Sequence, residues 1–136
     1  MYRRVMTVRI ALAGAGAFGI KHLDGLTGID DVEVVSLVGR TFDKTKMVAE
    51  EYGIEHVTTD LAESLDRNDV DAVILATPTQ MHASQSIQCL EAGKHVEVEI
   101  PLADSLADAQ AVVAKQAETG LVAMCGHTRR FNPSHQ

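Results

Sequence analysis

Two kinds of apolar segment alternate along this chain of 136 residues. Short runs are almost continuously apolar and rich in β-branched residues, which is typical of strands buried on both faces. Longer segments between them have the mixed pattern of surface helices, with glycine where several should end. The pattern predicts strands at 8–13, 32–38, 56–58, 72–76, 95–98 and 121–125, and helices at 18–28, 43–52, 60–66, 80–92 and 105–119.

Regular alternation of strands and helices defines the fold class. Consecutive parallel strands need crossover connections, and helices in those crossovers cover both faces of the sheet. We predict an α/β fold, a Rossmann-type doubly wound parallel sheet with strand order 3-2-1-4-5-6, in one dinucleotide-binding domain over residues 1–136. The chain stops soon after the sixth strand with no glycine stop or polar tail, so we expect it to be truncated.

A glycine-rich turn, Gly14-Ala-Gly-Ala-Phe-Gly19, joins the first predicted strand to the first helix. In this position Gly14 allows a tight turn, Gly16 lets a pyrophosphate approach the backbone, and Gly19 lets the helix pack closely. Ala17 and Phe18 open the helix, whose free N–H groups and positive dipole end would face the phosphates. The turn therefore predicts dinucleotide binding, with an unliganded structural turn as the alternative.

The end of the second strand bears on which dinucleotide binds. NAD sites usually place an Asp or Glu about 20 residues after the glycine turn, where it accepts from the ribose hydroxyls. This chain has Gly39 there, followed by Arg40 and Thr41. Glycine leaves room for a 2′-phosphate, the arginine can pair with it and stack on adenine, and the threonine adds a hydroxyl. We favour NADP over NAD, with a solvated surface arginine as the alternative.

Ligands of such sheets bind at the carboxyl edge, where the parallel strands end. Thr77 and Pro78 end the fourth strand, and the proline offers a stiff apolar wall beside the nicotinamide. His82, in the next helix, could reach the same crevice, although a capping or surface histidine is an alternative. The opposite edge holds residues that are poor candidates: Glu55, His56, Lys94 and His95.

Composition excludes several classes of partner. The net charge of −7 argues against a nucleic-acid or anionic-membrane surface, because both need a basic face. No apolar run approaches the roughly 20 residues of a membrane span. Two cysteines, Cys89 and Cys125, are best interpreted as reduced thiols in a cytoplasmic protein. His22, His82 and His127 are far apart in the sequence, so we predict no metal site.

Several motifs resemble those of the glucose–fructose oxidoreductase/inositol dehydrogenase (Gfo/Idh/MocA) family. They are the glycine turn, the Ala-Thr-Pro of the fourth strand end with its later histidine, the stretch Ala92–Ala103, and Arg130-Phe-Asn-Pro133. The resemblance implies an NAD(P)-dependent oxidoreductase that acts at a carbinol or hemiacetal carbon, and a second, substrate-binding domain beyond this chain. By family position, Glu99 would bond the nicotinamide ribose and Arg130 would lie near the cofactor or a domain junction.

One departure from the family pattern concerns catalysis. The usual Glu-Lys-Pro is Glu99-Ile100-Pro101 here, and isoleucine can supply neither a proton nor a charge. The surrounding residues are similar to a branch that oxidises a semialdehyde from aromatic ring cleavage, as its cyclic hemiacetal, with NADP. His127 and Arg129 would then suit an anionic small-molecule substrate. The catalytic base stays unassigned.

Three interpretations remain open from the sequence. We favour the NADP-binding domain of a hemiacetal or semialdehyde dehydrogenase, inactive as this chain alone and a homo-oligomer at full length. The replacement of lysine by Ile100 leaves a non-catalytic dinucleotide-binding or sensor module as one alternative. A fragment of an NAD(P)-dependent sugar or polyol dehydrogenase is the other.

Overall fold

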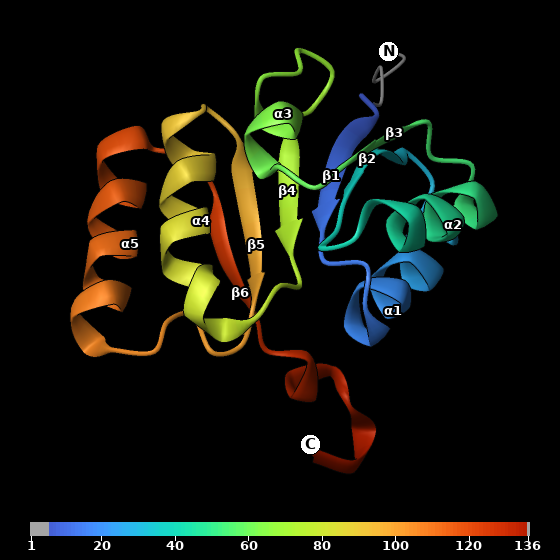
Figure 1. Cartoon of the computed structure of the whole chain (residues 1–136). Helices are drawn as coiled ribbons and strands as arrows, with labels where there is room; N and C mark the ends of the chain where they lie inside the picture. The colour runs from blue at the N-terminus through green and yellow to red at the C-terminus, as the bar shows by residue number, and fades with distance from the viewer. Residues whose placement is uncertain (1–5, 136) are drawn as a thin grey trace, which may run out of the picture.

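Residues 6–135 are described by a computed structural model, in which a parallel sheet lies between two groups of helices (Figure 1). The strands are β1 (Val8–Ala13), β2 (Val32–Val38), β3 (His56–Thr58), β4 (Ala72–Leu75), β5 (His95–Glu99) and β6 (Ala123–Gly126). The helices are α1 (Ala17–Leu26), α2 (Phe42–Tyr52), α3 (Leu61–Leu65), α4 (Thr79–Glu91) and α5 (Leu106–Thr119), followed by the short 3₁₀ turns η1 (Thr128–Phe131) and η2 (Pro133–His135). The order β3-β2-β1-β4-β5-β6, parallel throughout, confirms the predicted doubly wound sheet.

Alternate strand residues pack on opposite faces of the sheet, because side chains in a strand point up and down in turn. In β1, Ile10 and Leu12 join a core cluster with α1 and α2. Their neighbours Ala11 and Ala13 join a second cluster with α3 and α4. Helix α5 packs beside α4. Both faces of β1 are thus buried, which explains its continuous apolar sequence.

Side-chain caps and glycines mark the ends of several helices. Asp60 caps α3 by accepting from the N–H of Ala62, and Ser105 caps α5 by accepting from the N–H of Asp108. Gly53 and Gly120 end α2 and α5 in the left-handed conformation, with φ of 68° and 66°. A left-handed residue closes a helix most readily when it is glycine.

The sixth strand begins two residues later than predicted. The carbonyl of Leu121 accepts from the side chain of Gln116, and the N–H of Leu121 donates to Thr119 Oγ1. The N–H of Val122 donates to His95 Nδ1. These side-chain bonds occupy both N–H groups and the Leu121 carbonyl, so residues 121 and 122 connect α5 to β6 and the register with β5 starts at Ala123.

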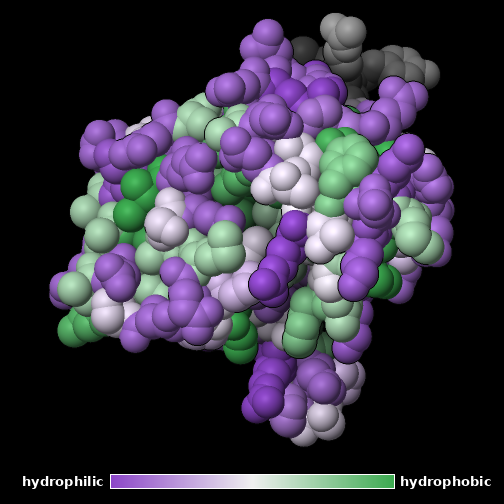
Figure 2. All heavy atoms as spheres, in the orientation of Figure 1, coloured by the Kyte–Doolittle hydropathy of each residue, from purple (hydrophilic) through white to green (hydrophobic). Residues whose placement is uncertain are grey.

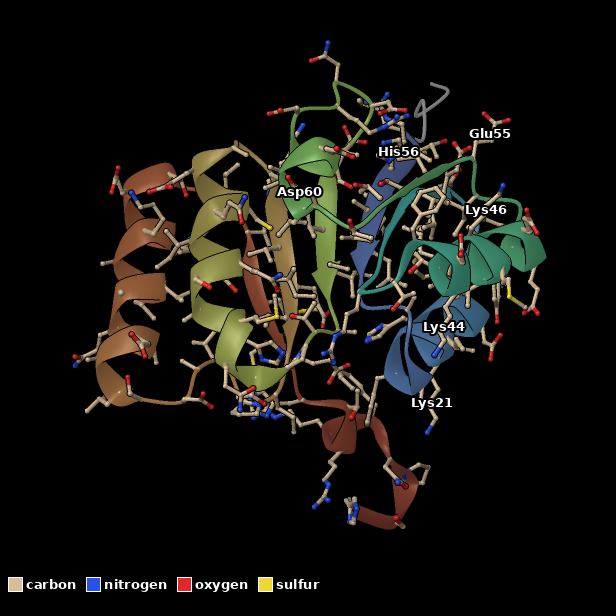
Figure 3. All side chains as sticks on the ribbon, viewed as in Figure 1. Lys21, Lys44, Lys46, Glu55, His56 and Asp60 are labelled. Atoms are coloured by element: carbon tan, nitrogen blue, oxygen red, sulfur yellow. The ribbon has the colours of Figure 1, made fainter. Side chains whose placement is uncertain are left out.

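The two edges of the sheet are separate in the view of Figure 1. The arrows of β1, β4 and β5 point downward, towards the carboxyl edge, where α1 begins and the C-terminal segment emerges. Glu55 and His56 lie at the upper, amino edge, as predicted (Figure 3). Apolar and polar side chains are interspersed over the visible surface of α4 and α5 (Figure 2). Among residues 6–135, no helix combines the length and the apolar character needed to cross a bilayer.

Candidate functional site

The glycine turn (14–19) has the geometry expected of a tight strand-to-helix connection. Gly14 has φ of 108°, and a Cβ added there would lie 2.3 Å from the carbonyl oxygen of Ala76. A Cβ on Gly19 would lie 1.7 Å from the carbonyl oxygen of Gly14. A Cβ on Gly16, in contrast, would have no atom within 4 Å. Gly14 and Gly19 are therefore required by the close packing of the turn. Gly16 borders open space.

The first turn of α1 faces that open space without a cap. Gly16 is the N-cap residue, no side chain caps the helix, and the first turn carries no acidic residue. Ala17 and Phe18 are exposed, and the Lys21 ammonium lies 5.5 Å from the centroid of the Phe18 ring. Uncapped N–H groups and the positive end of the helix dipole make this a surface that favours a phosphate. The residues present fit a dinucleotide pyrophosphate.

At the end of β2 the structure does not show the free room that the sequence predicted beside Gly39. Gly39 is buried, and the room beside it is already filled, because a Cβ at Gly39 would lie 1.9 Å from Thr45 Oγ1. Arg40 and Thr41 are exposed. Among residues 6–135 the Arg40 guanidinium has no ion-pair partner, and the hydroxyl of Thr41, the N-cap residue, does not cap α2. Gly39 therefore provides no free space of its own, and the groups available to a phosphate are the exposed Arg40 and Thr41 that follow it.

His82 does not offer a nitrogen to the crevice, contrary to the sequence prediction. Its side chain is buried, with Nε2 2.7 Å from the carbonyl oxygen of Thr77 and Nδ1 2.7 Å from that of Pro101. The ring thus links the loops that follow β4 and β5. Pro78 between them is exposed at the start of α4, and the Thr77 hydroxyl donates to Gln85. His82 therefore holds the loop that carries Pro78 and does not itself face a ligand.

Glu99, at the end of β5, pairs with a residue that the sequence argument had left aside. Its Oε1 lies 2.6 Å from His22 Nε2 on α1, and the Glu99 side chain is largely buried. Glu97, two residues earlier on the same strand face, has a buried Oε2 that finds no hydrogen-bond partner among residues 6–135. Burial, reinforced by the nearby charge of Glu99, raises the pKa of Glu97, against the opposing effect of His22. The spacing of two residues between the glutamates in a strand already indicates that both side chains lie on the same face of the sheet.

His22, Glu97 and Glu99 place one potential ligand atom each within 4.8 Å of one another. His22 and Glu99 are 77 positions apart in the sequence, so only the fold brings the three residues together. The contact between His22 and Glu99 joins one ring nitrogen to one carboxylate oxygen and ties α1 to the end of β5. The grouping therefore does not by itself amount to a metal site.

The segment after β6 presents its polar side chains to solvent. His127, Arg129 and Arg130 are exposed in and next to η1. Ile100, after β5, is also exposed, at 42%. Partial burial and the charges of Glu97 and Glu99 raise the pKa of the Cys125 thiol, so this cysteine is not set up as a thiolate nucleophile.

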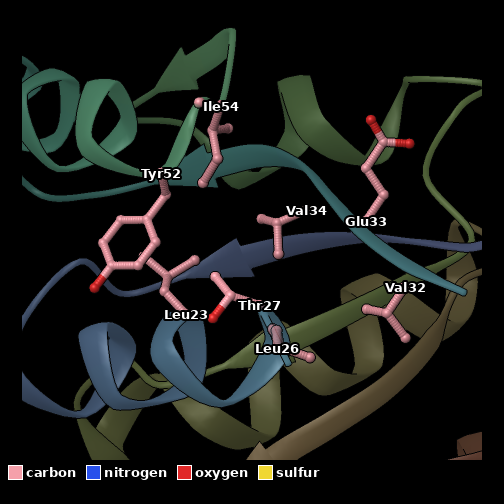
Figure 4. A pocket seen from close by; sticks show the side chains of 9 residues that line it. Leu23, Leu26, Thr27, Val32, Glu33, Val34, Tyr52 and Ile54 are labelled. Carbon is pink, nitrogen blue, oxygen red and sulfur yellow. The ribbon is translucent and has the colours of Figure 1, made fainter. Parts of the chain in front are cut away.

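One cavity lies away from these residues. It has a volume of about 270 Å³ and lies between the end of α1, the end of α2 and the start of β2 (Figure 4). Its lining includes Leu26, Val32 and Tyr52. This is the amino edge, so the cavity is unrelated to the glycine turn. We place the candidate site on the open carboxyl edge because its geometry, unlike the cavity, fits a specific ligand.

Known proteins resemble this chain in sequence and in fold. The model of the Gfo/Idh/MocA oxidoreductase family, NAD-binding Rossmann fold, matches residues 8–127. The 4-carboxy-2-hydroxymuconate-6-semialdehyde dehydrogenase of Sphingobium sp. (strain NBRC 103272 / SYK-6) is 68% identical over 129 residues, which are 95% of this chain and 41% of that enzyme. This chain therefore spans about two fifths of the length of that relative.

Two solved structures resemble the fold with different cofactors. A protein of gentamicin A biosynthesis, in complex with NAD, has a TM-score of 0.90 and 31% identity, covering 97% of this chain and 38% of its own. A 3-ketoreductase from Actinomadura kijaniata, in complex with TDP-benzene and NADP, has a TM-score of 0.87 and 31% identity, covering 94% and 40%. The fold thus accommodates either dinucleotide.

Proposed function

The chain belongs to the Gfo/Idh/MocA oxidoreductase family, and from this we propose that it is the NADP-binding part of a dehydrogenase that oxidises a hemiacetal or semialdehyde carbon. The observation that carries the proposal is the glycine turn with its uncapped helix at the carboxyl edge. The 68% identical relative supports 4-carboxy-2-hydroxymuconate-6-semialdehyde, a compound of aromatic degradation, as the substrate.

In this proposal the turn and the start of α1 hold the pyrophosphate. Gly16 leaves the backbone accessible, and the N–H groups that follow it donate to phosphate oxygens. Pro78 limits the nicotinamide side of the site, and Glu99, oriented by His22, accepts from a ribose hydroxyl. The bound dinucleotide supplies the hydride acceptor, while the chain contributes binding and orientation.

Arg40 and Thr41 provide the preference for NADP. The exposed guanidinium can bond a 2′-phosphate through two N–H groups, and the threonine hydroxyl is available to donate a further bond. No carboxylate stands at position 39 to repel the phosphate. His127 and Arg129, exposed beyond β6, would attract the carboxylates of an anionic substrate, and Arg130 would lie close to the cofactor.

The experiment is a titration of NADP⁺ and NAD⁺ into the wild-type chain and into Arg40→Ala. Loss of a charged hydrogen bond of about 1.5–3 kcal/mol should weaken NADP⁺ binding roughly 10- to 100-fold and leave NAD⁺ binding nearly unchanged. Lys46→Ala is the matched control, since it removes one exposed positive charge from the same helix region (Figure 3). Equal weakening of both dinucleotides by Arg40→Ala would contradict the phosphate clamp.

A second measurement separates binding from turnover. We expect the 136-residue chain to bind NADP⁺ without oxidising substrate, because Ile100 stands where the family has a lysine and the chain spans about two fifths of its 68% identical relative. Hydride transfer by this chain at an ordinary enzyme rate would contradict that expectation. The exposed Ile100 also supports a second candidate, a non-catalytic dinucleotide-binding module. If the full-length protein binds NADP⁺ but does not oxidise the semialdehyde, the module is favoured.

A further inference from the structure

We propose that Thr45, on α2, is a specificity-determining residue that excludes an NAD-type carboxylate from position 39. The inference rests on the proposed NADP function and extends it from Arg40 to a buried side chain. It starts from a steric observation. The ideal Cβ position at Gly39 lies 1.9 Å from Thr45 Oγ1 and 2.9 Å from both Cβ and Cγ2 of Thr45.

Thr45 has little freedom to move out of this space. Its side chain is buried, at 2% exposure, and its hydroxyl donates to the carbonyl oxygen of Thr41 over 2.8 Å. The N–H of Thr45 donates to the same carbonyl over 3.0 Å. A β-branched side chain has few rotamers in a helix, so turning it would break the hydroxyl bond and meet the preceding turn.

Gly39 is held equally firmly on the other side. Its N–H donates to the carbonyl oxygen of Thr58 in β3 over 3.0 Å, which continues the sheet beyond β2. Neither backbone can therefore retreat without disturbing the sheet or the start of α2. Gly39 and Thr45 are therefore held in fixed positions. The Thr45 side chain fills the space that a side chain at position 39 would need.

This pair affects cofactor choice because of what position 39 does in related sites. An Asp or Glu about 20 residues after the glycine turn accepts from the ribose hydroxyls of NAD and repels a 2′-phosphate. Such a side chain must begin at the Cβ position that Thr45 blocks. Thr45 also anchors the Thr41 carbonyl, and so fixes the loop that carries Arg40. Cofactor preference is then encoded at positions 39 and 45 together.

The test combines Gly39→Asp with a graded series at position 45 and measures the dissociation constants of NADP⁺ and NAD⁺ and the thermal midpoint. Thr45→Val keeps the volume but loses the hydroxyl, Thr45→Ala leaves only the Cβ at 2.9 Å, and Thr45→Gly removes the obstruction. In the wild-type background and in Thr45→Val, Gly39→Asp should lower the midpoint and weaken both dinucleotides. In Thr45→Ala, and more in Thr45→Gly, NAD⁺ affinity should rise at least about tenfold over Gly39→Asp alone.

Two results would overturn the proposal. One is that Gly39→Asp alone binds NAD⁺ as tightly as it does together with Thr45→Gly. The other is that Gly39→Ala lowers the thermal midpoint equally in all four backgrounds, which keeps the test decisive if Gly39→Asp does not fold. Failure of the proposed function looks different, since the wild-type chain would then bind neither dinucleotide or show no preference for NADP⁺.

Discussion

At the amino edge of the sheet, charged side chains bind the protein itself, whereas at the carboxyl edge the start of α1 is uncapped and Arg40 is exposed. Arg9 in β1 donates two side-chain bonds and one backbone bond to Asp71 before β4. Lys94 before β5 donates to the carbonyl oxygens of Arg67 and Val70. These contacts tie the strand starts and loops together.

The carboxyl edge contains few such ties among the described residues. Helix α1 begins without a side-chain cap, Arg40 has no ion-pair partner, and Gly16 borders open space. Two ties at this edge are the partly buried pair His22–Glu99, which connects α1 to β5, and His82, which links the loops after β4 and β5. Polar groups at one edge are used for stability, and at the other they remain available to a ligand. Substitutions at the two edges should therefore affect different measurements.

The largest effect on stability should come from a side chain added inside the glycine turn at the carboxyl edge. Gly19→Ala puts a Cβ 1.7 Å from a backbone oxygen, and such overpacking should lower the free energy of unfolding by about 3 kcal/mol. Gly16→Ala is the matched variant, with no atom within 4 Å of its Cβ. Denaturant unfolding should show a change within about 1 kcal/mol for Gly16→Ala.

Dinucleotide titration of the Gly16→Ala variant tests whether the space beside Gly16 binds the pyrophosphate. Gly16→Ala should weaken NADP⁺ binding at least about tenfold, since its methyl group enters the space that the pyrophosphate needs. Unchanged NADP⁺ affinity in a folded Gly16→Ala chain would show that the open space is not the phosphate site. Equal stability of the two variants would show that the turn tolerates a Cβ at Gly19.

A smaller effect, confined to stability, should follow at the amino edge. Lys94→Met keeps the apolar stem but leaves the carbonyl oxygens of Arg67 and Val70 without the ammonium, which should cost about 1–2 kcal/mol. NADP⁺ affinity should stay the same when measured well below the unfolding temperature. Lys46→Met, at an exposed position on α2, is the control and should change neither quantity. A loss of NADP⁺ affinity in folded Lys94→Met would contradict the separation of the edges.

The sequence predicted the sheet order and the place of the glycine turn because both depend on local patterns, such as apolar runs and glycine stops. It did not predict contacts made by residues distant along the chain or across a turn. His22 and Glu99 are 77 positions apart, and His82 bonds a carbonyl 19 positions away. The filled space beside Gly39 depends on where α2 places Thr45, which no residue pattern gives.

The smallest effect concerns acid stability, and it tests the amino edge alone. Hydrogen bonds from the Arg9 side chain, and then from its backbone N–H, hold the pKa of Asp71 below its ordinary value of 3.8. A depressed carboxyl pKa stabilises the folded chain above the ordinary value, and this contribution is lost as the pH falls through the lowered pKa. Asp71→Asn should therefore be less stable than wild type at pH 6, and the difference should shrink below about pH 4. Because the pair is partly exposed, the effect should be modest.

Urea unfolding of wild type and Asp71→Asn between pH 6 and pH 3 measures this difference. Asp69→Asn is a companion variant, since the side chain of Arg67 lowers the pKa of Asp69 in the same way in the same loop before β4. NADP⁺ affinity at pH 6 should be equal in all three chains, because neither aspartate lies at the carboxyl edge. A stability difference for Asp71→Asn that stays constant across the pH range would show that the Arg9 bonds do not depend on the charge of Asp71.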